Sequence, residues 1–192
     1  MKTYINPNVK EWTELVTRPE IKKETLNQQV EEILKEVKSK GDKALFSLSE
    51  KFDGVNLTSL EVSKQEFVES LNNVPLELQH AIQLAYSNIN RFHEAQLETE
   101  KIIETKPGVK CWRKSVAIEK IGLYIPGGSA PLFSTILMLG IPSKIAGCKE
   151  VILCTPPGKD GKINPAILFS AQLVGISKIY KIFTCLFYFS CT

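Results

Sequence analysis

A glycine-rich turn follows a short apolar run in Ile121-Gly-Leu-Tyr-Ile-Pro-Gly-Gly-Ser-Ala-Pro131. The run predicts a strand over residues 121–125, and the apolar residues after the turn predict a helix that ends at Gly147. A buried strand is expected at residues 150–155 and a third strand at residues 178–182, with a second helix between them. This β-α-β-α-β order indicates an α/β fold with a parallel sheet and right-handed crossovers.

Local signals mark the ends of the two predicted helices. Asn164 and Pro165 supply an N-cap and a first-turn proline, and Gly175 closes the second helix after Val174. Pro142 lies inside the first helix and removes one backbone hydrogen bond. We therefore expect a kink or a break near Ile141.

Residues 1–120 are expected to form a helical part that ends in a β-hairpin. Ser63 and Glu66 form a capping-box pattern, and Pro107-Gly108 is the turn of a hairpin with strands over residues 101–106 and 109–113. Residues 116–119 are expected to continue in strand. The apolar residues predicted to be buried on successive helices are Leu26, Val30, Ile33, Leu34 and Val37, then Leu45, Leu48 and Phe52, then Phe67, Leu71 and Val74, then Leu78, Ile82, Ala85, Ile89 and Phe92.

The composition is that of a globular protein. Among 192 residues, 43% are hydrophobic and 23% are charged, and the net charge of +3 is spread along the chain, which argues against nucleic-acid binding. The N-terminus has no signal-peptide pattern, and the apolar stretch at residues 136–141 is too short to span a membrane, so a cytoplasmic location is expected. Five cysteines without a CxxC pair indicate free thiols.

The turn at residues 124–129 has two interpretations. It leaves the carboxyl end of a strand, where ligands bind in parallel α/β sheets, and the following helix N-terminus suits a phosphate group. Tyr124 could pack on a planar ring, and Gly127 and Gly128 would let the backbone approach a ligand. However, the third glycine of a dinucleotide fingerprint is missing. A tight strand-to-helix turn without a ligand is therefore an equally good interpretation.

The other candidate residues show weaker patterns. His80 and His93 have no metal-ligand partner at suitable spacing, and Ser129, Ser134 and Thr135 have no evident base to activate a serine or threonine nucleophile. Cys148 and Cys154 fall at apolar positions typical of a core. Thr155-Pro156-Pro157 ends a strand at the same edge as the Gly-Gly turn, and we expect it to line the same crevice.

Longer motifs resemble a known family. Residues 121–157, which contain the turn above, and Gly161-Lys-Ile-Asn-Pro165 with its continuation to Tyr180 are similar to histidinol dehydrogenases. Phe52-Asp-Gly54 and Asn90-Arg-Phe-His-Glu-Ala-Gln96 occur in the order expected for that family. The resemblance extends over nearly the whole chain to about Ile182.

The resemblance implies a fold and an activity. It implies an incomplete Rossmann-like NAD-binding part over residues 121–182, with an aldehyde-dehydrogenase-like architecture. It also implies oxidation of L-histidinol to L-histidine by two NAD-dependent hydride transfers through an enzyme-held aldehyde, in a homodimer. A zinc ion and a Glu–His pair belong to this chemistry.

The residues that the resemblance assigns to NAD lie in the turn. Tyr124 matches the tyrosine that contacts NAD, and Pro126 lies in the same contact region. Gly127, Gly128 and Ser129 are further candidates from the geometry of the loop. No catalytic residue and no zinc ligand of the family matches a position in this chain.

The last residues depart from the family pattern. Residues 183–192 form an apolar tail with no charged side chain, where a Gly-Gly-Ala-Gln-type turn would be expected. We therefore expect a truncated chain that is inactive as given, through a frameshift or a premature stop. A nucleotide-binding or dimerisation module without catalysis is the alternative. An aldehyde dehydrogenase-like enzyme is a third hypothesis, disfavoured because it needs an exposed catalytic cysteine and no cysteine here occupies a suitable position.

Overall fold

The computed structural model describes residues 3–17, 23–127, 131–176 and 178–182. The chain divides into two compact units, Met1–Lys35 and Glu36–Thr192, and the division falls within helix α2 (Lys23–Lys40). The first unit contains α1 (Val9–Val16), which Asn8 and Glu11 open through a reciprocal capping box. The predicted positions Gly128 and Ser129, the tail 183–192 and the side chain of Leu26 lie outside the described residues.

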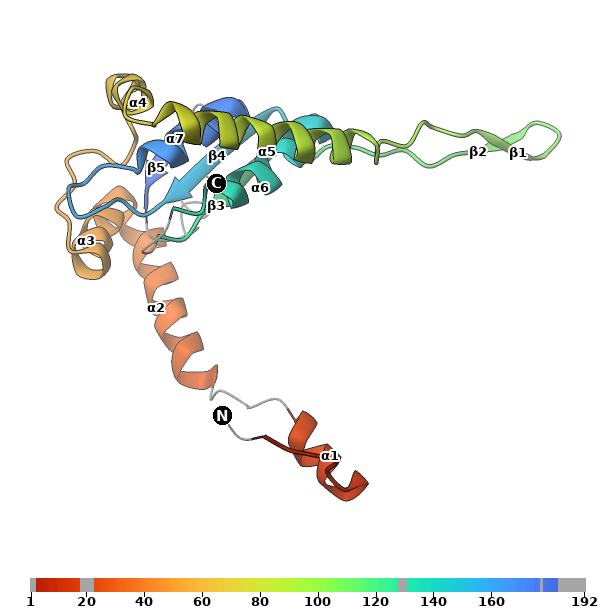
Figure 1. The fold of residues 1–192 in the computed structure, drawn as a ribbon, viewed down its shortest axis with the longest axis horizontal. Coiled ribbons are helices and arrows are strands. Elements are labelled where there is room, and N and C mark those ends of the chain that lie inside the picture. The colour runs from red at the N-terminus through yellow and green to blue at the C-terminus, as the bar shows by residue number, and fades with distance from the viewer. Residues whose placement is uncertain (1–2, 18–22, 128–130, 177, 183–192) are drawn as a thin grey trace. The chain divides into compact units, whose positions relative to one another are not determined.

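A parallel sheet forms the centre of the second unit (Figure 1). Its strands are β3 (Lys120–Tyr124), β4 (Glu150–Thr155) and β5 (Lys178–Lys181), in the order β3-β4-β5. Helix α6 (Phe133–Ala146) connects β3 to β4, and α7 (Pro165–Leu173) connects β4 to β5. The parallel β-α-β-α-β unit predicted from the sequence is therefore confirmed.

A short antiparallel segment extends the sheet beyond β5. The Val62 N–H donates to the Ile179 carbonyl at 2.9 Å, and the Lys181 N–H donates to the Leu60 carbonyl at 2.7 Å. Glu61 forms the bridge to Tyr180 between these two hydrogen bonds. The segment covers an edge of β5 that would otherwise expose unpaired backbone groups.

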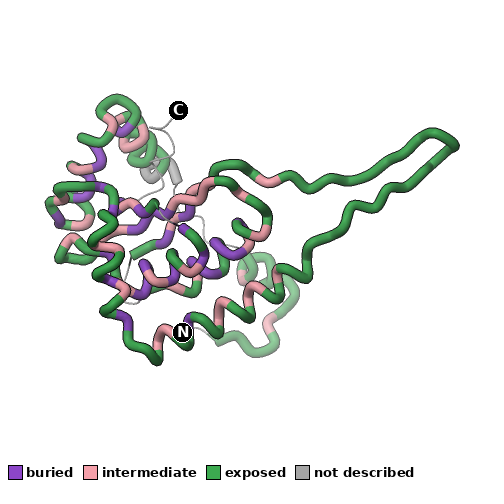
Figure 2. Tube along the Cα trace, turned by 90° about the horizontal axis from the view of Figure 1, so that it is seen from above, coloured by how far each residue is buried: buried purple, intermediate pink, exposed green. Residues whose placement is uncertain are grey.

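Helices α3 (Asp42–Asp53), α4 (Lys64–Leu71) and α5 (Leu76–Glu94) precede the sheet in the second unit. Contacts between α5, α6 and α7 enclose the main core, which appears as buried purple segments in Figure 2. The largest side chains buried in that core are Ile82, Ile125, Ile136, Leu137, Ile141, Leu153, Leu168 and Ile179. Among the described residues, no helix combines the length and apolar character that a membrane span requires.

Most helix ends follow the predicted local signals. Gly147 adopts a positive φ of 84° after α6, and Asn164 caps α7 by accepting from the Ala166 N–H at 2.9 Å. The Ser63 hydroxyl likewise accepts from the Glu66 N–H at the start of α4. Of the kink or break predicted near Ile141, the break is wrong, because α6 runs uninterrupted from Phe133 to Ala146; the kink stays a prediction. Helix α6 packs against α5 and α7, and such packing can offset the cost of an interior proline, about 3 kcal/mol.

Three side chains that were predicted to be buried are exposed, and one predicted strand is absent. Phe52 is 44% exposed and Phe92 is 65% exposed, although both continue the apolar spacing of their helices. Val30 is also exposed. Residues 116–119 are not a strand: only the Glu119 carbonyl bonds to the start of β4, no strand within the described ranges pairs with the rest, and β3 begins at Lys120. The predicted hairpin is confirmed as β1 (Ile103–Lys106) and β2 (Val109–Cys111).

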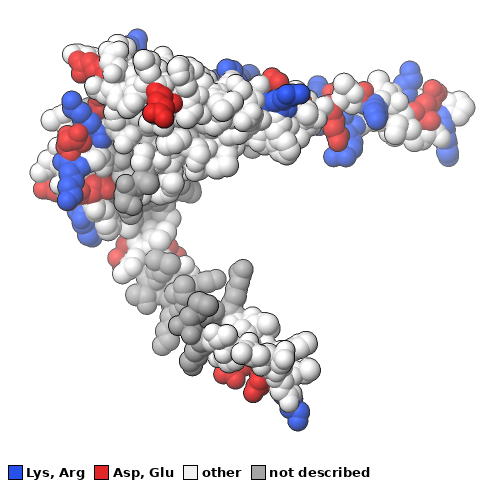
Figure 3. Space-filling view, in the orientation of Figure 1, with Lys and Arg blue, Asp and Glu red and all other residues white. Residues whose placement is uncertain are grey.

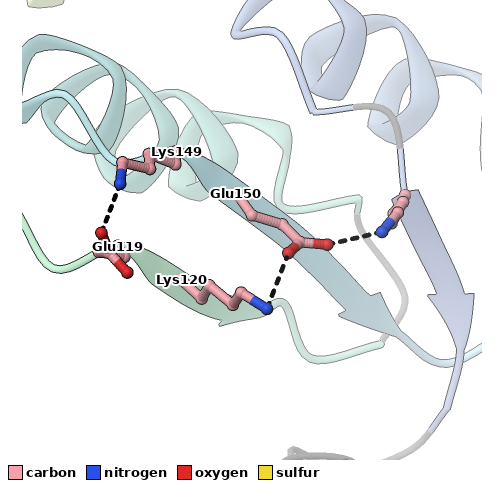
Figure 4. Close-up of polar contacts among 5 residues, drawn as sticks. Glu119, Lys120, Lys149 and Glu150 are labelled. Carbon is pink, nitrogen blue, oxygen red and sulfur yellow. Dashed lines mark hydrogen bonds and ion pairs between the residues drawn. The ribbon is translucent and has the colours of Figure 1, made fainter.

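Ion pairs connect the amino ends of the three parallel strands (Figure 4). Glu150 on β4 lies 2.6 Å from the Lys178 Nζ on β5 and 3.8 Å from the Lys120 Nζ on β3, and Glu119 pairs with Lys149 beside them. The hydrogen bond from Lys178 holds the pKa of Glu150 below its ordinary value, and Glu150 raises the pKa of Lys178. This cluster therefore lies at the amino ends of the strands, at the opposite end of the sheet from their carboxyl ends.

Candidate functional site

A hollow of about 320 Å³ opens at the carboxyl ends of β3 and β4. This volume is near the lower end of the roughly 300–1,000 Å³ that small-molecule sites occupy. Its walls come from the end of β3, the loop after β4 and the starts of α6 and α7. Its lining residues include Pro126, Gly127, Thr155, Pro156, Asp160 and Asn164.

The structure brings together part of the predicted NAD contact. Pro126 and Gly127 line the hollow, as do Thr155, Pro156 and Pro157, which the sequence predicted to share the same crevice. Tyr124 is the last residue of β3 and is half-buried, but it is not among the lining residues. It lies beside Cys154 in the register of the sheet, on the face opposite Leu123 and Leu153. Tyr124 is therefore placed next to the hollow and not in its wall.

Gly127 approaches the loop after β4 more closely than any other residue type could. A Cβ atom at this position would lie 2.5 Å from the Pro156 Cγ, and a proline ring cannot swing away as a flexible side chain can. The glycine is thus required by packing between two walls of the hollow. The presence of glycine at position 127 is therefore explained by a tight strand-to-helix turn without a ligand.

The two helices that begin at the hollow differ in their free backbone donors. At α7, the Asn164 side chain accepts from the Ala166 N–H, and Pro165 has no N–H. At α6, Leu132 stands at the N-cap position and its side chain makes no capping hydrogen bond, while neither helix has an acidic residue in its first turn. Helix α6 therefore keeps the stronger capacity to bind an anion.

A tight turn places a pair of opposite charges on the wall. The Gly158 N–H donates to the Lys162 carbonyl at 2.8 Å, and the Lys162 N–H donates to the Asp160 Oδ1 at 3.1 Å. Asp160 and Lys162 both line the hollow, as does Asn164. The sequence interpretation missed these three residues as site residues. The glycines at 158 and 161 beyond a buried strand were the available signal.

A second, polar hollow of about 310 Å³ shares Asp160 and Lys162 with the first. It contains the ion pair between the Lys181 Nζ at the end of β5 and Glu66 on α4, at 2.7 Å. Both side chains are largely buried, and the second carboxylate oxygen of Glu66 has no hydrogen-bond partner among the described residues. This pair connects the end of the sheet to α4.

The other candidates lie away from the hollow. His80 is exposed on α5, and the His93 ring contacts Phe92 and Gln96. Cys154 is buried and Cys148 half-buried, as expected for core residues, whereas Cys111 is exposed on β2. In the part of the chain that the structure describes, no group of three or more His, Cys, Asp or Glu residues could hold a metal ion. These residues therefore do not fit the zinc ion that the resemblance implies.

Comparison with known proteins identifies the family. The model of the family described as histidinol dehydrogenase matches residues 16–184. The chain belongs to the histidinol dehydrogenase family. This is a family of oxidoreductases of histidine biosynthesis, and the resemblance inferred from the sequence is confirmed.

Individual histidinol dehydrogenases agree with this chain in sequence and in fold. The enzyme from Bacteroides fragilis (strain YCH46) is 52% identical over 182 residues, which are 95% of this chain and 42% of that protein. The enzyme from Mannheimia succiniciproducens is 51% identical over 168 residues, 87% of this chain and 38% of that protein. The crystal structure of histidinol dehydrogenase from Elizabethkingia anophelis matches with a TM-score of 0.89 and 51% identity, over 98% of this chain and 43% of that chain. The chain thus spans less than half the length of these histidinol dehydrogenases.

Proposed function

We propose that this chain supplies the NAD-binding edge of a histidinol dehydrogenase. The observation that supports the proposal is the hollow at the carboxyl ends of β3 and β4, in a chain of that family. The whole protein would oxidise L-histidinol to L-histidine through the aldehyde in two NAD-dependent steps, the last step of histidine biosynthesis. It would act as a homodimer in the cytoplasm, with no nucleic-acid or membrane partner.

The residues of the hollow fit one part of a dinucleotide. Bound NAD would supply the acceptor for a hydride from the substrate. Pro126 and Gly127 form one wall, and the N-terminus of α6, where Leu132 offers no side-chain cap, is suited to the pyrophosphate. Tyr124, at the end of β3, would pack its ring beside the cofactor. A volume of about 320 Å³ holds a part of NAD and not the whole molecule.

Oxidation of histidinol needs an acid–base pair and a zinc site, and the described residues provide neither. His80 and His93 both lie outside the hollow, so neither histidine can act there as a base in a pair with Glu. The described residues do not fit zinc. We therefore expect the 192-residue chain alone not to oxidise histidinol.

Calorimetric titration with NAD tests the binding proposal. We expect a saturable signal from the chain, and an affinity about tenfold lower for Tyr124→Ala, because a lost ring contact is worth roughly 1.4 kcal/mol. Tyr124→Phe should keep most of the affinity. Tyr4→Ala, an exposed tyrosine of the first unit, serves as the matched control. A flat titration with a folded chain would refute the proposal.

NADH absorbance tests the expectation about turnover. The chain is mixed with histidinol, NAD and zinc, and the histidinol dehydrogenase of Bacteroides fragilis is the positive control. We expect no NADH above the enzyme-free rate from the 192 residues. Measurable turnover would show that this chain contains the catalytic groups after all.

A further inference from the structure

Asp160 and Lys162 are the charged residues that line the hollow in the described part of the chain. Both lie in the turn that follows β4, the middle strand of the sheet. Backbone hydrogen bonds close this turn, because the Gly158 N–H donates to the Lys162 carbonyl at 2.8 Å and the Gly161 N–H donates to the Gly158 carbonyl at 2.9 Å. The turn therefore fixes where these two charges lie on the wall.

The Asp160 carboxylate folds back over the turn and uses one of its oxygens there. Its Oδ1 accepts from the Lys162 N–H at 3.1 Å. A Cβ atom at position 158 would lie 2.9 Å from the same oxygen, so glycine at this position leaves room for the carboxylate. Asp160 is exposed and belongs to none of the ion pairs found among the described residues. Its second oxygen, Oδ2, is therefore available to a ligand.

The hollow suits the adenosine half of NAD better than the nicotinamide half. The unit β3-α6-β4-α7-β5 has the topology of one mononucleotide-binding half of a dinucleotide-binding sheet, and a volume of about 320 Å³ agrees with one half of the cofactor. The nicotinamide ring has to meet the substrate and an acid–base group, and the described lining residues include no histidine. Pro156 and Pro157 offer apolar surface to a flat base instead.

We propose that Asp160 accepts from the ribose hydroxyls of the adenosine half and thereby makes the site select NAD over NADP. NADP differs from NAD by a phosphate on the adenosine 2′-oxygen. This phosphate removes a hydroxyl donor and brings a like charge against the carboxylate, which weakens binding by roughly tenfold or more. The inference rests on the proposed NAD site and names the residue that decides which of the two dinucleotides it takes.

Lys162 allows the proposal to be tested in both directions. It lines the same hollow, and none of the ion pairs among the described residues involves it, so its ammonium group is available to an anion. Asp160→Asn keeps the oxygen that accepts from the Lys162 N–H and removes the negative charge. Lys162 is then the remaining charge on the described wall, and it attracts a 2′-phosphate. The variant should therefore lose affinity for NAD and gain affinity for NADP.

Calorimetric titration of the full chain with matched ligands measures this selection. AMP and adenosine 2′,5′-bisphosphate differ only in the 2′-phosphate, as do NAD and NADP. We expect AMP to compete with NAD, and each 2′-phosphorylated ligand to bind about tenfold or more weakly than its partner. Nicotinamide mononucleotide should not compete, because its half of the cofactor lies outside the hollow.

Three variants complete the experiment. Asp160→Asn should bring the affinities for NAD and NADP to within roughly threefold of each other. The double variant Asp160→Asn/Lys162→Gln should lose the gain for NADP and keep the loss for NAD. The arm of residues 97–119 carries exposed charges of both signs (Figure 3). Glu100→Gln removes one of these charges as the matched control and should leave the ratio of affinities unchanged. Circular dichroism verifies that each variant is folded.

Each failure can be assigned to one of the two proposals. If NAD binds and nicotinamide mononucleotide competes with it while AMP does not, the assignment of Asp160 is overturned and the proposed NAD site stands. An unchanged ratio of NAD to NADP affinity in folded Asp160→Asn has the same meaning. A folded wild-type chain that binds neither NAD nor AMP overturns the inference and the proposed function together.

Discussion

Gly127 and Pro156 determine how closely two walls of the candidate site approach each other. The missing side chain of Gly127 lets the Pro126–Gly127 backbone lie against the Pro156 ring. Because both residues line the hollow, its width depends on this contact. Gly127 is thus both a steric requirement and a proposed NAD contact.

Gly127→Ala should destabilise the chain by about 1–3 kcal/mol, the usual cost of an overpacked position. Urea unfolding measures the change. Pro156→Ala in the same chain should recover part of the loss, because it removes the Cγ atom that lies 2.5 Å from the added Cβ. Pro157→Ala is the matched control and should recover nothing. Equal stability of Gly127→Ala and wild type would contradict the packing explanation.

Helix α6 packs closely against the end of α7. Gly140 of α6 faces Val174, where a Cβ would lie 2.6 Å from Cγ2 and 2.9 Å from Cβ of the valine. Both residues are buried.

Gly140→Ala should be destabilising even though alanine favours a helix interior by about 1 kcal/mol over glycine. The overlap with Val174 costs roughly 1–3 kcal/mol and outweighs that gain. Thermal and urea unfolding measure the balance. In a Val174→Gly background the same substitution should become neutral or stabilising, because the overlapping atoms are gone. Additive effects of the two substitutions would argue against direct contact.

The stability of the whole molecule depends on pH through the ion pairs that join the three strands. The folded-state pKa of Glu150 lies below its ordinary value of 4.5, so the stabilisation is present above that pH and is lost as the pH falls through the folded value. The pKa of Lys178 lies above 10.5, so the stabilisation is present below that pH and is lost as the pH rises further.

Glu150→Gln should lower stability at pH 7 and leave it almost unchanged near pH 2, because the wild-type carboxyl is then protonated. Urea unfolding across this range measures the difference, which should shrink in high salt. Glu31→Gln removes an exposed pair with Lys35 on one helix and should show little effect. A pH-independent difference for Glu150→Gln would contradict the electrostatic origin.

Much of the candidate site followed from sequence patterns. The strand ends at Tyr124 and Thr155 predicted which residues would meet at one edge, because parallel strands place their carboxyl ends together. Asp160, Lys162 and Asn164 were missed, since their place in the wall depends on the turn over residues 158–162. The assignment of the loop to NAD came from family resemblance and stays a proposal.

Local chemistry was sufficient for the order of the elements from α2 to β5, apart from the strand wrongly predicted at residues 116–119, and for most of their ends, whereas α1 was missed. Caps such as Asn164 and left-handed glycines such as Gly147 act within one turn of helix, so they can be recognised without the rest of the chain. Burial and strand pairing required the folded chain. Phe52 and Phe92 are exposed and residues 60–62 pair with β5, because both outcomes depend on which distant segment reaches that position.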